Sequence, residues 1–422
     1  MKDYNQAASK NQEAKKERGT MTRTCAVTVD TRADLLALSI KAGLQVVAAQ
    51  LQEDVRLICG GRHERHLDRQ ALRWGQCAGE IVLGGKKIGI ERPRARGWDG
   101  REFRLPSYRH YQDEKTLTAR VLEQILVGVS QRNYGRALAA EDAAHPGQGI
   151  SRSAVSRRFA MRAGRLLEAW LTRSLKELQP LVIFIDGIEF AGYTVVAALG
   201  VDLQGEKHPL GIWDGSSENA EVCKNMLDNL FARGLSVDAS ILFVIDGSKA
   251  LHKALVDRFG PEAVIQRCQY HKRQNVRAQV PKRLQRDMDR TLRQAYQSET
   301  GDQARRIIRS LIGRLEVLAP GAAASLREGL DETLTVIDLG LPKLLRKSFS
   351  TTNAIESAFS GVRGVTRHVK RWRNGRMVVR WMAVGFLEAA KHFHKVSGYD
   401  KMPALAEALA KRKKVVDNDQ VA

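Results

Sequence analysis

Two short apolar runs, each ending in Asp-Gly, constrain the fold of this chain more than any other feature. The first run, Leu181–Ile185, leads into Asp186, and the second, Ile241–Ile245, leads into Asp246. Each run is too short for a helix and lacks polar alternation, so each predicts a strand buried on both faces. One such run is compatible with a strand and a structural turn. Two of them predict paired carboxylates at the carboxyl edge of a sheet, where open α/β sheets bind ligands, and favour a metal site there.

The charge balance narrows the class of partner. The 422 residues contain 69 Lys and Arg against 47 Asp and Glu, a formal net charge of +22. An excess of this size favours an extended polyanion, and nucleic acid is the commonest soluble one. No apolar run is long enough to span a membrane, residues 1–24 hold no apolar core typical of a signal peptide, and five scattered cysteines suggest no disulfide framework. We expect a cytoplasmic, nucleoid-associated protein with no membrane partner.

Composition and periodicity divide the chain into five segments. We expect a disordered lead-in at 1–30, a helix and β-hairpin region at 31–110, a helix-turn-helix-like DNA-binding domain at 111–176, an α/β domain at 177–400 and a charged, frayed tail at 401–422. Within the α/β domain, residues from about 272 to 346 are expected to be almost wholly helical.

The order of elements in the α/β domain predicts how the two aspartates meet. The strand ending at Asp186 is followed by strands at 193–201 and 208–213, which predict an antiparallel meander. A helix, the strand ending at Asp246 and a helix capped by Ser248 come next. The order β-β-β-α-β-α is that of the ribonuclease H-like fold. Its first and fourth strands are neighbours, which would bring the two aspartates together.

Cysteine and histidine occur together in two places. The next short strand is expected at 263–272 and contains Cys268 and His271, which are too few ligands for a structural zinc. We interpret them as a pair that orients groups near the carboxylates. An earlier group has the spacing C-x3-H-x2-H-x10-C, which matches no common zinc finger, so a solvated basic loop is the alternative to a metal site: Cys59, His63, His66 and Cys77.

A third acid, Glu356, lies at the predicted start of a helix. Asn353 as N-cap with Glu356 three residues later would form a capping box, a purely structural role. The two roles are compatible, because a carboxylate near a helix N-terminus can still reach a metal.

Basic residues cluster at two sites that suit DNA. Residues 115–175 predict three helices, and the third begins near Ser151 with arginines at its start, as in a recognition helix, although many three-helix clusters bind no DNA. From Arg363 to Arg380, both included, there are seven Lys or Arg and no acid. Such a segment would bind phosphates, while Trp372 could stack on a base or serve as a buried anchor. The candidate DNA-binding residues are Arg152, Arg157, Arg158, Arg363, Arg367, Lys370, Arg371, Trp372, Arg373 and Arg376.

A Gly-Gly turn at 84–85 predicts a β-hairpin over 81–90. Its basic continuation, 91–96, either lies along a phosphate backbone or is a solvated edge strand.

Taken together, these residues resemble the mutator-type family of bacterial insertion-sequence transposases. The resemblance covers most of the chain, from the Gly-Gly hairpin to beyond Trp381. The matching pieces, in order, are Asp186-Gly, the Leu-Gly-Ile-Trp strand, Phe231-Ala-Arg-Gly-Leu, Asp246-Gly, Gln266-Arg-Cys268-x2-His271-Lys and Thr351-Thr-Asn-Ala-Ile-Glu356. The family often has arginine directly after the glutamate, whereas this chain has Ser357.

The resemblance implies a fold and a mechanism. The fold would be a ribonuclease H-like catalytic core with an all-helical insertion, preceded by a mainly helical DNA-binding region with a β-hairpin. The catalytic residues would be Asp186, Asp246 and Glu356, a DDE triad that binds two Mg²⁺ ions, for which Mn²⁺ can substitute. Cys268 and His271 would support this site.

The implied substrates are double-stranded DNA of two kinds, the inverted repeats of the element and the target. Strand cleavage at the element's end would release a 3′-OH, which would then attack target DNA directly. Because two ends are handled together, we expect a homodimer or a larger assembly. Two alternatives remain open: another ribonuclease H-like nuclease, such as a junction resolvase, and a catalytically silent DNA-binding regulator derived from a transposase.

Overall fold

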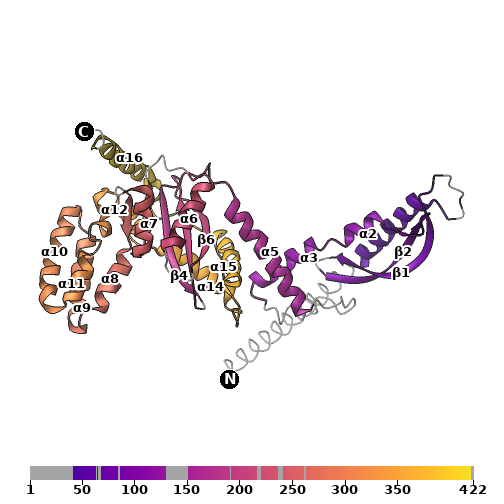
Figure 1. The fold of residues 1–422 in the computed structure, drawn as a ribbon, viewed down its shortest axis with the longest axis horizontal. Helices are drawn as coiled ribbons and strands as arrows, with labels where there is room; N and C mark the ends of the chain where they lie inside the picture. The colour runs from indigo at the N-terminus through magenta and orange to yellow at the C-terminus, as the bar shows by residue number, and fades with distance from the viewer. Residues whose placement is uncertain are drawn as a thin grey trace, which may run out of the picture. The chain divides into compact units, whose positions relative to one another are not determined.

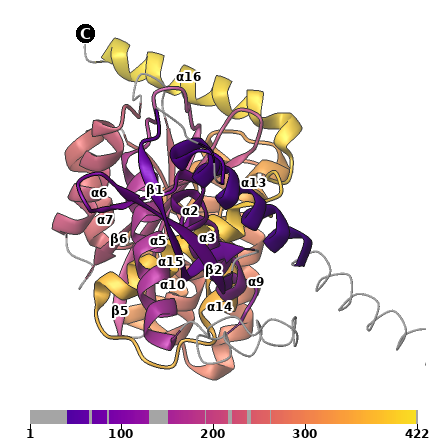
Figure 2. The same cartoon turned by 90° about the vertical axis from the view of Figure 1, so that its right-hand side faces the viewer.

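The computed structural model describes residues 41–62, 64, 68–83, 86–129, 151–190, 192–215, 220–235, 241–260 and 263–419. The chain divides into two units, Met1–Arg162 and Ala163–Ala422, which we describe separately. Figure 1 shows the ribbon and Figure 2 the same ribbon turned by 90°. The predicted lead-in at 1–30 and the second of the three helices predicted at 115–175 lie outside the described residues.

An antiparallel hairpin forms most of the first unit's sheet. β1 (Ala71–Leu83) pairs with β2 (Lys86–Gly97), and the short β3 (Glu102–Phe103) adds to β2. The predicted hairpin is confirmed, with strands longer than expected; Gly84 and Gly85 at its turn lie outside the described residues. Residues 41–59 are helical, and Leu51 and Val55 of this helix pack in one core with Ile81 and Ile88 of the hairpin.

Three further helices follow the hairpin. They are α2 (Pro106–Tyr111), α3 (Lys115–Leu126) and α5 (Arg152–Thr172). α3 coincides with a predicted helix and ends just before Gly128, whose φ of 98° suits a glycine. At the start of α5, the Ser151 hydroxyl accepts a hydrogen bond from the Ala154 N–H at 3.2 Å, so the helix begins where the sequence predicted.

The second unit is a mixed α/β structure built on a five-stranded sheet. β4, β5 and β6 form the predicted antiparallel meander, and β7 and β8 add to β4 in parallel, so the strand order is β6-β5-β4-β7-β8. The strands are β4 (Val182–Phe190), β5 (Tyr193–Val201), β6 (Lys207–Gly215), β7 (Leu242–Ile245) and β8 (Val264–Arg267).

Helices cover both faces of this sheet, as the apolar runs predicted. Successive side chains of a strand point to opposite faces, and β4 follows this rule: Val182 and Phe184 belong to one core, whereas Ile183 and Ile185 belong to the other. The first core includes residues of α14 (Asn353–Thr366) and α15 (Gly375–Ala390), and the second includes residues of α6 (Ala220–Ala232) and α7 (Lys249–Phe259). β4 is therefore buried on both sides.

The segment between β8 and α14 is almost wholly helical, as predicted. It contains α8 (Gln269–Ala278), α9 (Lys282–Tyr296), α10 (Gly301–Leu318), α11 (Pro320–Arg327), a 3-10 turn η1 (Asp331–Thr333), α12 (Thr335–Asp338) and α13 (Lys343–Phe349). The expected strand at 263–272 is wrong in its second half: β8 ends at Arg267, Cys268 is the N-cap of α8, and His271 lies on that helix.

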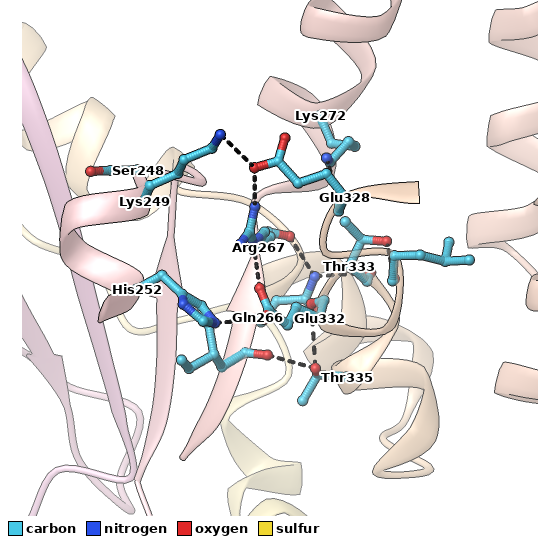
Figure 3. Close-up of polar contacts among 12 residues, drawn as sticks. Ser248, Lys249, His252, Gln266, Arg267, Lys272, Glu328, Glu332, Thr333 and Thr335 are labelled. Atoms are coloured by element: carbon cyan, nitrogen blue, oxygen red, sulfur yellow. Dashed lines mark hydrogen bonds and ion pairs between the residues drawn. The ribbon is translucent and has the colours of Figure 1, made fainter. Parts of the chain in front are cut away.

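Polar contacts join this helical segment to the edge strand β8 (Figure 3). The side chain of Gln266 is fully buried; its Nε2 donates to the Thr333 carbonyl at 3.0 Å, and its Oε1 accepts from the Val336 N–H at 3.0 Å. The buried guanidinium of Arg267 forms an ion pair with Glu332. Because β8 lies at the end of the strand order, these contacts cover an edge that would otherwise be open to pairing.

The C-terminal segment differs from the expected tail. After η2 (Tyr399–Lys401), residues Met402–Asp419 form the helix α16. Met402, Leu405 and Leu409 of α16 are buried in the first core, the one that contains Val182 and Phe184 of β4. Their spacing places them on one face of the helix. None of the described helices has the length and apolar character needed to cross a membrane.

Candidate active site

Strand pairing places the two predicted aspartates next to each other. The parallel pairing of β4 with β7 ends at Ile185 opposite Ile245, and Asp186 and Asp246 are the next residues of the two segments. We expected Asp186 to follow its strand, but β4 continues beyond it to Phe190 because β5 still pairs with it. Asp186 alternates with Ile185 and therefore faces the side of the sheet that α14 covers.

Burial and like charge make Asp186 an unusual carboxyl group. Only 4% of the residue is exposed. Burial, and then the neighbouring charge of Asp246, raise its pKa to about 8, while His271 acts in the opposite direction and Glu356 adds a smaller increase. In the described part of the chain, no lysine or arginine forms an ion pair with either aspartate. The site therefore has carboxylates that a cation could stabilise.

The N-termini of α8 and α14 meet beside these aspartates. The Cys268 N–H donates to the Ile245 carbonyl at 2.7 Å, which holds the start of α8 against the end of β7. The Gln269 N–H donates to the Ser350 carbonyl at 2.9 Å and so joins α8 to the segment before α14. Two sequence-distant helix starts are thus fixed at the carboxyl end of β7.

Glu356 is held by Thr352, a residue for which the sequence predicted no role of its own. The Thr352 hydroxyl donates to Glu356 Oε1 at 2.6 Å. The predicted capping box is wrong: Thr352 is the N-cap of α14 and makes no side-chain cap, and Asn353 is already the first helical residue. The four-residue spacing of Thr352 and Glu356, one helical turn, was a usable indication of their contact.

Cys268, His271 and Glu356 form a close group whose possible ligand atoms all lie within 4.8 Å of one another. Asp186 and Asp246 are not part of that closer group. Burial raises the pKa of the Cys268 thiol, but hydrogen bonds from His271 and Thr352 outweigh it and the net shift is downward. The hydrogen bond to Cys268 raises the pKa of His271 to about 9 against the effect of burial. The pair therefore favours its charged form.

Comparison with known proteins adds to this geometry. A family model described as "Transposase, Mutator family" matches residues 10–396. The chain belongs to this family. The transposase for insertion sequence element ISRM5 of Rhizobium meliloti (strain 1021) is 25% identical over 92% of this chain and 98% of that protein. The transposase for IS6120 of Mycolicibacterium smegmatis is 28% identical over 63% of this chain and 81% of that protein. The transposase for IS256 in transposon Tn4001 of Staphylococcus aureus is 27% identical over 57% of this chain and 62% of that protein.

The arginines at the start of α5 differ in exposure and in whether they already form an ion pair. Arg152 and Arg157 are exposed. Arg158 is half-buried, and its Nη1 donates to Glu114 Oε2 at 2.6 Å, while Lys87 lies 2.9 Å from the other oxygen of Glu114. The hydrogen bond from Arg158 holds the pKa of Glu114 at about 2 despite partial burial. Arg158 is thus already engaged in an ion pair.

The second basic segment is available to solvent. Arg363 lies on α14 two turns after Glu356 and is exposed. In the described part of the chain, none of the six predicted cations here forms an ion pair with an acid. They are Arg363, Arg367, Lys370, Arg371, Arg373 and Arg376.

Trp372 packs edge-on against Phe190 at the end of β4, with ring centroids 5.0 Å apart. Its half-buried ring supports the anchor reading, and stacking on a base stays a prediction.

The earlier cysteine and histidine group is only partly described. Cys59 is buried and Cys77 is half-buried, and both are free thiols. His63 and His66 lie outside the described residues. The solvated basic loop and the metal site both stay open as interpretations of this group.

Proposed function

We propose that this chain is a DDE-type DNA transposase with a ribonuclease H-like catalytic core. It binds the inverted repeats of its insertion sequence and catalyses metal-dependent strand cleavage and strand transfer. The observation that carries the proposal is the parallel register of β4 and β7, which brings Asp186 beside Asp246, with Glu356 in the same electrostatic environment. The order β6-β5-β4-β7-β8, three antiparallel strands followed by two parallel ones, supports the fold assignment.

The residues of the site fit divalent metal ions. Mg²⁺ prefers oxygen ligands, and Asp186, Asp246 and Glu356 offer carboxylates from three separate elements. The raised pKa of Asp186 reflects buried and repelling carboxylates, and nearby cations would favour their charged forms. Two ions, Mg²⁺ or Mn²⁺ in its place, would neutralise charge that develops on the phosphate during displacement.

The protein's own side chains would orient this site. The Thr352 hydroxyl holds Oε1 of Glu356, and Oε2 is the second oxygen that Glu356 could offer to a metal ion. His271 Nε2 lies 4.0 Å from Glu356 Oε1, so a protonated imidazole would limit the negative charge there. Exposed Arg363 lies on the helix that carries the glutamate, and together with the exposed cations that follow α14 it would bind the DNA backbone.

The bond changes balance without an external energy source. In cleavage, water attacks a phosphodiester, one P–O bond forms, one breaks, and a 3′-OH is released. In transfer, that 3′-OH attacks a phosphodiester of the target, and again one P–O bond forms and one breaks. We propose that a homodimer or larger assembly handles both ends, with residues 111–176 reading the inverted repeats through a helix-turn-helix-like domain.

The test is an assay of cleavage and joining on DNA that carries the inverted repeats flanking the gene, with Mg²⁺. Asp186→Asn, Asp246→Asn and Glu356→Gln are each expected to lower the rate by on the order of 10³-fold, equivalent to about 4 kcal/mol of transition-state stabilisation. Asp202→Asn is the matched control, because Asp202 lies beside another acid and a histidine, Glu206 and His208, outside this site. Circular dichroism checks that each variant is folded.

The outcomes separate the alternatives. Equal rates for wild type and Asp186→Asn would show that the carboxylate reading is wrong. Repeat binding without any cleavage by wild type would favour the silent regulator. Cleavage that does not depend on the repeats would favour another ribonuclease H-like nuclease.

A further inference from the structure

A basic pocket lies between the helical segment and the residues that lead into α14. Its volume is about 750 Å³, and it is lined by residues of α8, α9, α12 and α13 and by the connection that contains Ser350 and Thr351. Among the described residues that line it, none is acidic. Five are cationic: Arg273, Arg293, Lys343, Arg346 and Lys347.

Most of this positive charge is not neutralised within the described chain. Arg293, Lys343 and Lys347 are exposed and form no ion pair there. Arg346 donates to backbone carbonyls, including that of Ser298 at 2.8 Å, and forms no ion pair with an acid in the described chain. The Nε of Arg273 lies 3.9 Å from a carboxylate oxygen of Asp289, which is a long ion pair. The pocket therefore attracts an anion such as a phosphate group.

The pocket also offers an aromatic ring and an unused polar atom. Tyr270 is 41% exposed, and the Arg273 guanidinium lies 5.7 Å from the centre of its ring. The Thr351 hydroxyl oxygen is buried and has no hydrogen-bond partner in the described chain. An aromatic ring beside cations is the arrangement by which proteins bind unpaired nucleotides.

Two chain segments connect the pocket directly to the catalytic group. Tyr270 precedes His271 on α8, and Thr351 precedes Thr352, which holds Glu356. The hydrogen bond from Gln269 to Ser350 fixes these segments together. A DNA strand held at the carboxylates would therefore reach the pocket with an adjacent nucleotide.

We propose that this pocket binds one unpaired nucleotide of the DNA strand that is cut, with its phosphate on the cations and its base stacked on Tyr270. The volume lies within the range of sites for single small ligands. Extrusion of a base from a duplex costs unstacking free energy, so an already unpaired strand should bind better. The assignment of the strand rests on the proposed function, but binding by the pocket can be measured without catalysis.

The first test is a titration of the full chain with fluorescein-labelled oligo(dT) in EDTA, followed by anisotropy. Arg293→Glu/Lys347→Glu is expected to weaken binding by about ten-fold or more and to reduce the salt slope by about 0.7, since each phosphate contact on a single strand contributes about 0.7 and the pocket holds one phosphate. Arg306→Glu/Arg309→Glu is the matched control, because both arginines are exposed on α10 and neither lines the pocket.

The second test locates the base. Oligo(dT) with one 5-iododeoxyuridine is crosslinked by ultraviolet light, and the modified peptide is identified by mass spectrometry. We expect the crosslink at Tyr270. Tyr270→Phe should keep it, whereas Tyr270→Leu should lose it and weaken binding by about five-fold or more.

Three results would overturn the proposal. The first is a crosslink found only outside the pocket, and the second is an equal loss of oligo(dT) affinity in the pocket and control variants. The third is a loss of affinity in the pocket variant that is equal for single-stranded and duplex DNA, titrated in the same way. The last would reduce the pocket to a backbone contact. Because the binding is measured in EDTA, failure of the triad variants to stop cleavage would refute the proposed function and leave this binding result unaffected.

Discussion

Among the described carboxyl groups, that of Asp186 has the largest upward pKa shift, so its charged form is the most strongly disfavoured in the metal-free protein. Its pKa of about 8 lies far above its ordinary value of 3.8, first through burial and then through Asp246. Such a shift is common where a protein keeps a group ready for a ligand at the expense of stability.

This shift predicts a pH-dependent stability difference for Asp186→Asn in EDTA. Between about pH 4 and pH 8 the folded protein binds a proton that the unfolded chain has released, so wild-type stability falls as pH rises through this window. Asparagine does not titrate. The variant should match wild type near pH 4 and become more stable by a few kcal/mol near pH 8, measured by urea unfolding. A difference that is independent of pH would contradict the assigned pKa.

The ion pair of Glu114 with Arg158 predicts the opposite dependence. The pKa of Glu114 falls from 4.5 to about 2, so the contribution of the pair is present above about pH 4.5 and is lost as pH falls through about 2. Because the Glu114 side chain is 40% exposed, we expect Glu114→Gln to cost only about 1 kcal/mol at neutral pH. Faster amide exchange in α3 should report it. The exposed pair of Glu53 and Arg56 provides the control: Glu53→Gln should leave amide exchange in α3 unchanged.

At the level of elements, the buried amide of Gln266 makes two of the hydrogen bonds that connect β8 to the helical segment. Gln266→Leu would leave the Val336 N–H without its partner and would remove one of two donors to the Thr333 carbonyl, which also accepts from Gln269 Nε2 at 2.8 Å. We expect a loss of about 2 kcal/mol in unfolding free energy. Lys249→Ala removes an exposed contact with Glu328 in the same network and should change stability by less than about 0.5 kcal/mol. Equal effects of the two substitutions would show that the buried amide has no special role.

The strands were predictable because burial on both faces leaves an apolar run in the sequence. β5 has the predicted bounds, and β4 differs mainly by its extension past Asp186. The start of α8 was not predictable, because Cys268 makes no side-chain cap that would mark it. In α14, the local pattern suited an Asn353 cap, but the contact of Thr352 with Glu356 depends on the folded site.

Features that assemble from distant segments were outside the reach of the sequence. The basic pocket needs α8 and the Ser350 connection to meet, which a long-range backbone hydrogen bond records. α16 was missed because its charged residues outnumber the apolar positions that the core buries, such as Leu405 and Leu409. The two apolar runs indicated Asp186 and Asp246, whereas the catalytic role of Glu356 came mainly from the resemblance. The pairing of β4 with β7 then placed the two aspartates side by side.

For the whole molecule, each hydrophobic core lies within one unit. The two cores around the five-stranded sheet use residues from Trp170 to Leu409, and the core of the hairpin region uses residues from Val47 to Leu105. We therefore expect the segment Ala163–Ala422 to fold alone and to be stabilised by Mg²⁺. Thermal unfolding with and without Mg²⁺ tests this. A segment that is unfolded at all temperatures would show that the second unit needs the first.

The long helical segment between Asp246 and Glu356 also sets the order in which the site can form during translation. The two acids are 110 positions apart (356 − 246), and a ribosome adds roughly 5–20 residues each second, so the nascent chain carries both aspartates for roughly 5–20 s before the glutamate exists. A frameshift or stop codon within the helical segment would yield a product that keeps the first unit and never acquires Glu356. On the proposed mechanism, such products would occupy DNA ends without cutting them, so translation errors would restrain the element's own spread.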